Sequence, residues 1–258
     1  MIRISNVTKT FDGFKALDNL TLTVPKGSIY GLMGLNGAGK STIINHLADF
    51  LRQDEGVITI DGETVNDNES LKQRVQIIQD ELYFPRGYKL KNMEEYYRRI
   101  YQKWNQARYR EIISDFGLPE NKSIRAFSKG MKKQAAFALA LAATPDVLIL
   151  DEPIDGLDPI IKRKLWKFVM DDVADREMTV LVSSHNAKEM ENVCDHIGIM
   201  SNGKIVFEGN LLELMPVSIE EIFIEKLGGN IEYHNPNFEQ GSKAVGGHAV
   251  TGGEYDEK

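Results

Sequence analysis

The chain has 258 residues, enough to bury a substantial interior in one large domain or in a core with a small subdomain. Its 31 Lys and Arg against 38 Asp and Glu give a formal charge of -7, which argues against broad electrostatic attachment to nucleic acid or anionic lipid. Cys194 is the single cysteine, so an intramolecular disulfide is excluded and we expect this side chain to serve packing.

The longest apolar run, residues 135–143, is about half as long as a bilayer crossing requires. The N-terminus lacks the apolar stretch of a signal peptide. We therefore expect a cytosolic chain that reaches a membrane only through a partner or a surface.

The first eighty residues are predicted to be rich in strands, with one helix at 41–51. Four segments have strand character: 2–11, 20–27, 28–34 and a hairpin at 56–65. The pattern then changes, because residues 81–143 are rich in aromatics and place apolar residues three and four apart, as helices do.

Strand character returns in DVLILDE (146–152), an apolar run typical of a strand buried in a parallel sheet. An amphipathic helix (159–173), a strand (179–184), a further helix and a hairpin (197–209) follow. Alternation of strands and helices indicates an α/β core with a parallel sheet. Residues 216–229 are predicted to form one more helix.

The string GLNGAGKST (34–42) lies between a predicted strand and a helix and matches the pattern of a phosphate-binding loop. Glycines let backbone N–H groups point at a triphosphate, Lys40 reaches its terminal phosphates, and the Ser41 hydroxyl can ligate Mg²⁺. The helix that follows directs its positive end at the same anion.

Two carboxylates, Asp151 and Glu152, end a buried strand beside this loop. Side chains alternate along a strand, so we expect the two to point to different faces. Asp151 would then orient a metal shell, and Glu152 would polarise a water for attack on the γ-phosphate. His185 and Gln79 also follow apolar strands, although on their own both are ordinary strand ends.

FSKGMKKQ (127–134) allows two interpretations. Ser128 fits the N-cap of the helix that carries the long apolar run, with the lysines on a solvated face. Alternatively, Gly130 lets an anion approach the backbone N–H groups, which would make a second phosphate cradle that serves a nucleotide on a neighbouring molecule.

Taken together, these residues resemble the ATP-binding subunit of an ABC transporter over about the first 229 residues. GLNGAGKST looks like the Walker A motif, VLILDE like Walker B, and FSKGM like the signature usually written LSGGQ. The resemblance implies a P-loop NTPase fold: an α/β, RecA-like core with a mainly parallel sheet, an antiparallel β subdomain and a helical subdomain.

The resemblance also implies how the chain is divided. The expected parts are 1–80 (core with β subdomain and Walker A), 81–143 (helical subdomain with the signature), 144–215 (core with Walker B, D-loop and switch histidine), 216–229 (C-terminal helix) and 230–258 (disordered tail).

By the same resemblance ATP is the ligand and Mg²⁺ its cofactor. Glu152 is implied as general base and His185 as the γ-phosphate contact, with Ser41, Gln79 and Asp151 around the metal. The implied nucleotide contacts, including an adenine-stacking Phe11, the Q-loop Gln79 and the D-loop Asp158, are Phe11, Asn36, Gly37, Ala38, Gly39, Lys40, Ser41, Thr42, Gln79, Ser128, Lys129, Gly130 and Asp158.

In this family two cassettes pair head to tail, as a homodimer or a heterodimer, and drive permease subunits on separate chains at the inner face of the membrane. Lys129 and Met131, in place of the usual Gly and Gln, make the signature similar to cassettes of ABC-2 type exporters. Two alternatives stay open: a soluble ABC ATPase acting on ribosomes or DNA, and a regulatory switch with slow turnover. We expect no nucleic-acid partner.

Overall fold

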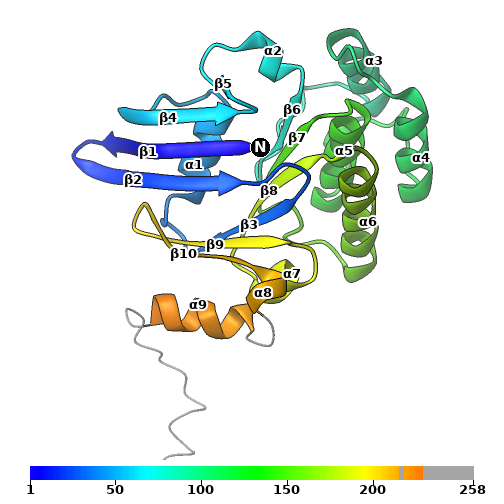
Figure 1. Ribbon diagram of the computed structural model, residues 1–258. Helices are drawn as coiled ribbons and strands as arrows, with labels where there is room; N and C mark the ends of the chain where they lie inside the picture. The colour runs from blue at the N-terminus through cyan, green and yellow to red at the C-terminus, as the bar shows by residue number, and fades with distance from the viewer. Residues whose placement is uncertain (215–217, 229–258) are drawn as a thin grey trace, which may run out of the picture.

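The computed structural model describes residues 1–214 and 218–228 (Figure 1). The strands are β1 (Ile2–Phe11), β2 (Phe14–Val24), β3 (Ile29–Gly34), β4 (Glu55–Ile60), β5 (Glu63–Thr64), β6 (Val75–Ile78), β7 (Val147–Asp151), β8 (Thr179–Ser184), β9 (His196–Ser201) and β10 (Lys204–Asn210). The helices are α1 (Lys40–Leu47), α2 (Glu69–Lys72), α3 (Leu90–Ile100), α4 (Gln106–Phe116), α5 (Lys129–Ala142), α6 (Pro159–Arg176), α7 (Ala187–Glu191), α8 (Leu211–Leu214) and α9 (Ile219–Leu227). The expected tail, 230–258, lies outside the described residues.

The centre of the fold is a six-stranded sheet in the order β10-β9-β3-β8-β7-β6. Neighbouring strands from β9 to β6 are parallel, and β10 pairs with β9 as an antiparallel hairpin. A second, antiparallel sheet has the order β2-β1-β4-β5. The expected mainly parallel core with a separate antiparallel sheet is therefore confirmed.

The central sheet is covered on both faces, and the strand residues alternate accordingly. Val147 and Ile149 of β7 belong to an apolar cluster with α1 and the antiparallel sheet. Leu148 and Leu150 belong to a second cluster with α3 to α7. The result is a layered fold in which the antiparallel sheet and α1 lie on one side and helices α3 to α6 on the other (Figure 1).

The aromatic-rich segment after β6 folds into helices α3, α4 and α5. Its aromatic rings pack on one another: Tyr97 lies 6.3 Å from Trp104, and Trp104 lies 5.4 Å from Tyr109, between ring centroids. Helix α3 ends at Ile100, so the chain turns before Trp104 instead of continuing the helix. That turn brings the indole ring back onto Tyr97.

Several basic residues of the same segment also have partners within the fold. Arg108 of α4 donates to Asp172 of α6 at 2.6 Å, and Arg99 pairs with Glu95 one turn earlier on α3 at 2.5 Å. Contacts within the protein thus account for part of its mixed aromatic and basic composition, which resembles that of nucleic-acid binders.

The amphipathic helix predicted at 159–173 is α6, and the single cysteine serves packing as expected. Helix α6 turns its apolar face inward, with Leu165 and Val169 buried. The Cys194 thiol is buried, and burial raises its pKa. None of the helices in residues 1–214 and 218–228 combines the length and apolar character that a bilayer crossing requires.

We predict that Gly198→Ala destabilises the fold by about 1–3 kcal/mol, the range for overpacking a core. A Cβ atom at position 198 would lie 2.2 Å from the buried hydroxyl of Tyr30, which donates to Glu208 at 2.9 Å. Urea unfolding measures the loss. In a double-mutant cycle Tyr30→Phe should recover part of it, and strictly additive losses would contradict the clash.

Candidate active site

The phosphate loop joins the carboxyl end of β3 to the N-terminus of α1. Gly37 and Gly39 have φ of 82° and 109°, in the left-handed region that favours glycine. A Cβ on Gly39 would also lie 2.7 Å from the carbonyl oxygen of Ala16. The first turn of α1 contains no acidic residue, so its N–H groups and positive end stay available to an anion.

Lys40 is nearly fully buried beneath this loop. Its ammonium donates to the carbonyl oxygens of Gly34 at 2.7 Å and Leu35 at 3.3 Å, and lies 3.9 Å from Glu152 Oε1. Burial lowers the pKa of Lys40, while the nearby carboxylates of Glu152 and Asp151 oppose that shift. The Lys40 ammonium therefore lies at the base of the phosphate loop, where the carboxylates of Glu152 and Asp151 offset its positive charge.

Asp151 is the last residue of β7 and is buried. Ser183 on the neighbouring strand β8 donates its hydroxyl proton to Asp151 Oδ1 at 2.5 Å, which fixes the carboxylate. Asp151, Ser41 and the phosphate loop all line one cleft of about 350 Å³.

The alternation expected for Asp151 and Glu152 is wrong. Strand β7 ends at Asp151, and Glu152 has φ 44°, a left-handed conformation that is uncommon for a non-glycine residue. Its backbone N–H donates to Ser183 Oγ at 3.1 Å. As a result both carboxylates line the same cleft instead of pointing to opposite faces of the sheet.

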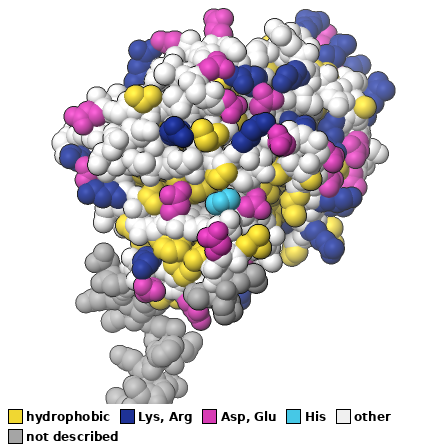
Figure 2. All heavy atoms as spheres, viewed as in Figure 1, with side chains coloured by type: hydrophobic (Ala, Val, Ile, Leu, Met, Phe, Trp, Pro, Cys, Tyr) yellow, Lys and Arg dark blue, Asp and Glu magenta, His cyan; other side chains and the backbone are white. Residues whose placement is uncertain are grey.

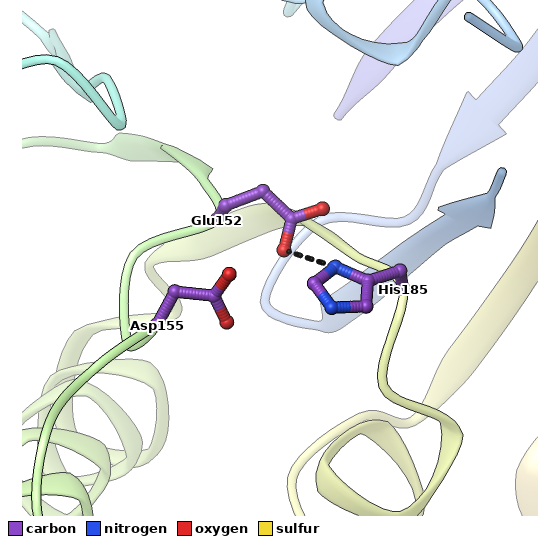
Figure 3. Close-up of side chains that lie close together, drawn as sticks. All are labelled: Glu152, Asp155 and His185. Atoms are coloured by element: carbon purple, nitrogen blue, oxygen red, sulfur yellow. Dashed lines mark hydrogen bonds and ion pairs between the residues drawn. The ribbon is translucent and has the colours of Figure 1, made fainter. Parts of the chain in front are cut away.

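The Glu152 side chain lies in a small cluster with His185 and Asp155 (Figure 3). Nδ1 of His185 is 3.2 Å from Glu152 Oε2, and one ligand atom of each of the three side chains lies within 4.8 Å of the others. Burial raises the pKa of Glu152, and the interaction with His185 opposes that rise. A carboxylate with a raised pKa is a better proton acceptor near neutral pH.

Phe11 ends β1 and lines the same cleft as the phosphate loop, with 41% of the residue exposed. The Lys9 ammonium lies over its ring, 5.5 Å from the centroid. Phe14, across a tight turn, lines the cleft as well. The mouth of the cleft thus offers two exposed aromatic rings to a planar base.

Gln79 follows β6 and does not line this cleft. Its amide nitrogen donates to Asn45 Oδ1 on α1 at 3.2 Å. The predicted metal-ligand role of Gln79 therefore stays a prediction, and the contact observed is to the helix that carries the phosphate loop.

The signature residues lie on helix α5, away from the cleft. Ser128 is its N-cap, since its Oγ accepts from the N–H of Met131 at 3.1 Å, which confirms the predicted cap. The Lys129 ammonium lies 3.5 Å from Asp80. Gly130 is packed closely, because a Cβ atom at this position would lie 3.2 Å from the side chain of Leu157.

The D-loop residue Asp158 is likewise a helix cap. Its carboxylate accepts from the N–H groups of Ile160 and Ile161 at the start of α6, each at 3.1 Å. Within this single chain neither Asp158 nor the signature residues line the cleft of the phosphate loop.

Residues of the site that were not predicted include Asp155, Phe14 and Ser183. The motif IDGLD contains Asp155, but only the folded turn brings its carboxylate to Glu152 and His185. A serine inside TVLVSS is an ordinary strand residue in sequence. Its contact with Asp151 depends on the pairing of β7 with β8.

A family model described as ABC transporter matches residues 17–155. The chain is 32% identical to the ABC transporter ATP-binding protein YtrB of Bacillus subtilis, over 87% of this chain and 76% of YtrB. It is 32% identical to NatA of the same organism, over 88% of this chain and 98% of NatA. The daunorubicin/doxorubicin resistance ATP-binding protein DrrA of Streptomyces peucetius is 33% identical, over 83% of this chain and 66% of DrrA.

Solved structures of ATP-binding cassettes are similar as well. An ATP-binding subunit of an ABC transporter superimposes with a TM-score of 0.80 at 25% identity, over 88% of this chain and 99% of the other. A dimeric cassette, MJ0796 with ADP and Pi bound, gives a TM-score of 0.72 at 25% identity, over 82% and 99%. The chain therefore belongs to the ABC transporter family, as an ATPase cassette built on the P-loop fold.

Proposed function

We propose that this chain is the ATP-hydrolysing subunit of a transporter, that it works as one of a pair of cassettes, and that the membrane permease is formed by separate chains. The observation that carries the proposal is the single cleft in which the phosphate loop, Asp151 and Glu152 meet. ATP-driven transport is the activity of the family, and the roles proposed for individual residues combine the resemblance of the motifs with the geometry of the cleft.

Nucleotide binding follows from the walls of the cleft. The adenine ring stacks on Phe11, whose exposed ring is held by Lys9. The phosphates lie over the loop of residues 36–42, within reach of its N–H groups. Lys40 exchanges its carbonyl contacts for phosphate oxygens, because a charged acceptor binds an ammonium more strongly than a neutral carbonyl does.

The residues present fit a Mg²⁺ ion. The cation prefers oxygen ligands, and the Ser41 hydroxyl and the Asp151 carboxylate line the cleft beside the phosphate loop. The Ser183 hydroxyl fixes the direction of Asp151. When bound, the ion supplies positive charge to the phosphate oxygens.

Hydrolysis uses Glu152 as the general base. Its carboxylate takes the proton of a water that attacks the γ-phosphorus, while the bond from that phosphorus to the bridging oxygen breaks and ADP leaves. The raised pKa of Glu152 suits it to accept the proton. His185, at 3.2 Å, holds the carboxylate in place and contacts the γ-phosphate. Lys40 stays close enough to offset the negative charge that gathers at this end of the cleft.

The signature completes the site of a second copy or of a related cassette. Ser128, Lys129 and Gly130 lie at the exposed N-terminus of α5, outside the cleft of their own chain. A phosphate bound in a neighbouring cassette would meet that helix end and its positive pole. The dimer of MJ0796 with ADP and Pi is an example of paired cassettes.

We assign the permease contact to a groove of about 500 Å³ between the core and the helical segment. Phe50, Leu71, Tyr97 and Tyr101 are among its lining residues, and 68% of Phe50 is exposed. Strand β6 runs along the groove and leads directly to Gln79, which gives the contact a short path to α1.

Export is the direction we favour. The relatives include proteins named for daunorubicin/doxorubicin resistance and for bacitracin transport, and the signature contains the Lys129 and Met131 that resemble exporter cassettes. The substrate itself would contact the permease.

Two other functions are less well supported. On the face shown in Figure 2, Lys and Arg side chains are interspersed with Asp and Glu, so this face offers nucleic acid no large basic surface. A regulatory nucleotide switch with slow turnover would have the same cleft, so only the measured rate of ATP hydrolysis distinguishes it from a transport ATPase. Recovery of the chain on ribosomes or DNA, rather than with a hydrophobic multispan protein, would overturn the proposal.

We predict that Glu152→Gln lowers ATP turnover by about 100- to 10,000-fold, the range for loss of a general base. The amide keeps the size of the carboxylate but takes up no proton, so ATP binding is retained and closed dimers accumulate. Phosphate release and size-exclusion chromatography measure the two effects. The surface variant Glu111→Gln is the control, and normal turnover of Glu152→Gln would remove Glu152 as the base.

We predict that Ser128→Arg abolishes ATP-dependent dimerisation and lowers turnover on the order of tenfold or more, since each 1.4 kcal/mol of lost association is tenfold. The long cation would meet the partner's nucleotide site, while ATP binding to the cleft of the same chain stays unchanged. Ser114→Arg, on the exposed face of α4, is the matched control. Loss of ATP binding by Ser128→Arg would contradict an action on the partner.

We predict that Phe50→Asp weakens co-purification of the permease about tenfold or more, because it places a charge in an apolar contact. ATPase activity of the isolated cassette should be unchanged. Val206→Asp on β10, which is also exposed, is the control. Equal permease recovery with both variants would exclude the groove as the contact.

A further inference from the structure

Lys133 of helix α5 is completely buried, with 0% of the residue exposed. It follows Ser128 by five residues in the string FSKGMKKQ, for which one of the two interpretations placed the lysines on a solvated face. Its neighbours Ala135 and Phe137 are ordinary core residues. A buried ammonium is costly unless all its protons find acceptors, so packing alone does not explain a lysine at this position.

Three acceptors surround the Lys133 ammonium. It donates to the backbone oxygen of Glu152 at 2.8 Å, to the backbone oxygen of Asp155 at 3.3 Å and to Asp80 Oδ1 at 3.3 Å. Two of the acceptors belong to the turn that follows β7, and the third follows Gln79 directly. One side chain therefore ties the signature helix to the turn that carries Glu152 and to the loop that follows β6.

Hydrogen bonds hold the peptide groups on both sides of Glu152. Its N–H donates to Ser183 Oγ at 3.1 Å, and its carbonyl oxygen accepts from Lys133. The same residue has φ 44°, a sparsely populated conformation that persists only where surrounding contacts over-determine it. The two hydrogen bonds supply such contacts.

We infer that Lys133 is a positioning residue for ATP hydrolysis: it holds the backbone of Glu152 in the left-handed turn that aims its carboxylate at the attacking water. The inference rests on the proposed role of Glu152. Lys133 itself contacts neither the cleft nor the phosphate loop, so it acts through Glu152. Its loss should affect the chemical step and leave nucleotide binding intact.

Asp80 extends this connection to the loop after β6. Its carboxylate lies 3.3 Å from the buried ammonium of Lys133 and 3.5 Å from the exposed ammonium of Lys129. A movement of that loop would change the counter-charge of Lys133 and, through it, the peptide of Glu152. We therefore include Asp80 in the inference, as the residue that links the loop to the catalytic turn.

The test is Lys133→Met, which keeps an unbranched side chain of similar length and donates no hydrogen bond. We expect kcat for ATP to fall by about 10- to 100-fold, as for misplacement of a catalytic group by about 1 Å, while KM and the Kd of ADP stay within about twofold. Lys133→Gln, whose amide can still donate, should recover part of kcat. Lys132→Met removes the same charge from the adjacent residue and should behave as the wild type.

Glu152→Gln, assayed beside these variants, separates two kinds of failure. If Glu152→Gln turns over normally, the proposed function of Glu152 fails. If Glu152→Gln is inactive and Lys133→Met keeps its kcat, only the positioning role is overturned. A fall in kcat with an equal loss of ADP affinity would also overturn it, because that result indicates general disruption.

Asp80→Asn provides the test if Lys133→Met does not fold, as judged by circular dichroism. The Asp80 side chain is 45% exposed, so the fold should accept an amide there. We expect a smaller fall in kcat, of about three- to tenfold, with unchanged ADP affinity, since a partly lost contact costs less than a complete one. An unchanged kcat in Asp80→Asn would then overturn the inference.

Discussion

The active site depends on the register of three neighbouring parallel strands. Ser183 of β8 is paired with Leu32 of β3 on one side and with Asp151 of β7 on the other. This pairing brings the start of the phosphate loop, Asp151 and the residue before His185 to the same edge of the sheet. Because a slip of one residue would turn each of these side chains to the opposite face, the whole cleft is a consequence of strand pairing.

Buried positive charge is the second feature that shapes the site. Lys40 and Lys133 are both hidden from solvent, both donate to backbone carbonyl oxygens, and both ammonium groups lie close to Glu152. The two lysines differ in whether the oxygens of a ligand can replace these carbonyl acceptors. Lys40 lies in the wall of the cleft, where phosphate oxygens can reach it, whereas Lys133 lies beneath the turn and keeps its partners. Lys40 is therefore suited to bind a ligand, and Lys133 is suited to hold the backbone of the turn.

Whether a contact could be predicted from the sequence depends on how far apart its partners lie along the chain. The phosphate loop and the Ser128 cap were predicted because their partners lie within a few residues along the chain. The burial of Lys133 could not be predicted, because its acceptors lie 19, 22 and 53 residues away. The alternation expected for Asp151 and Glu152 failed for the same reason: the left-handed turn is held by Ser183 and Lys133, which no local pattern reveals.

The lysines around the signature now have separate explanations. Lys129 is 66% exposed and Lys133 fully buried, yet both approach the carboxylate of Asp80. In a paired cassette the N-terminal end of α5 would meet the partner's phosphates. The exposed Lys129 ammonium would then have two possible anionic partners, Asp80 and the partner's phosphate. If Lys129 turned to the phosphate, the Asp80 carboxylate would keep the ion pair with Lys133 and lose the one with Lys129. Closure of the pair and the geometry of the catalytic turn would then be coupled through one carboxylate, without a change in the secondary structure of either element.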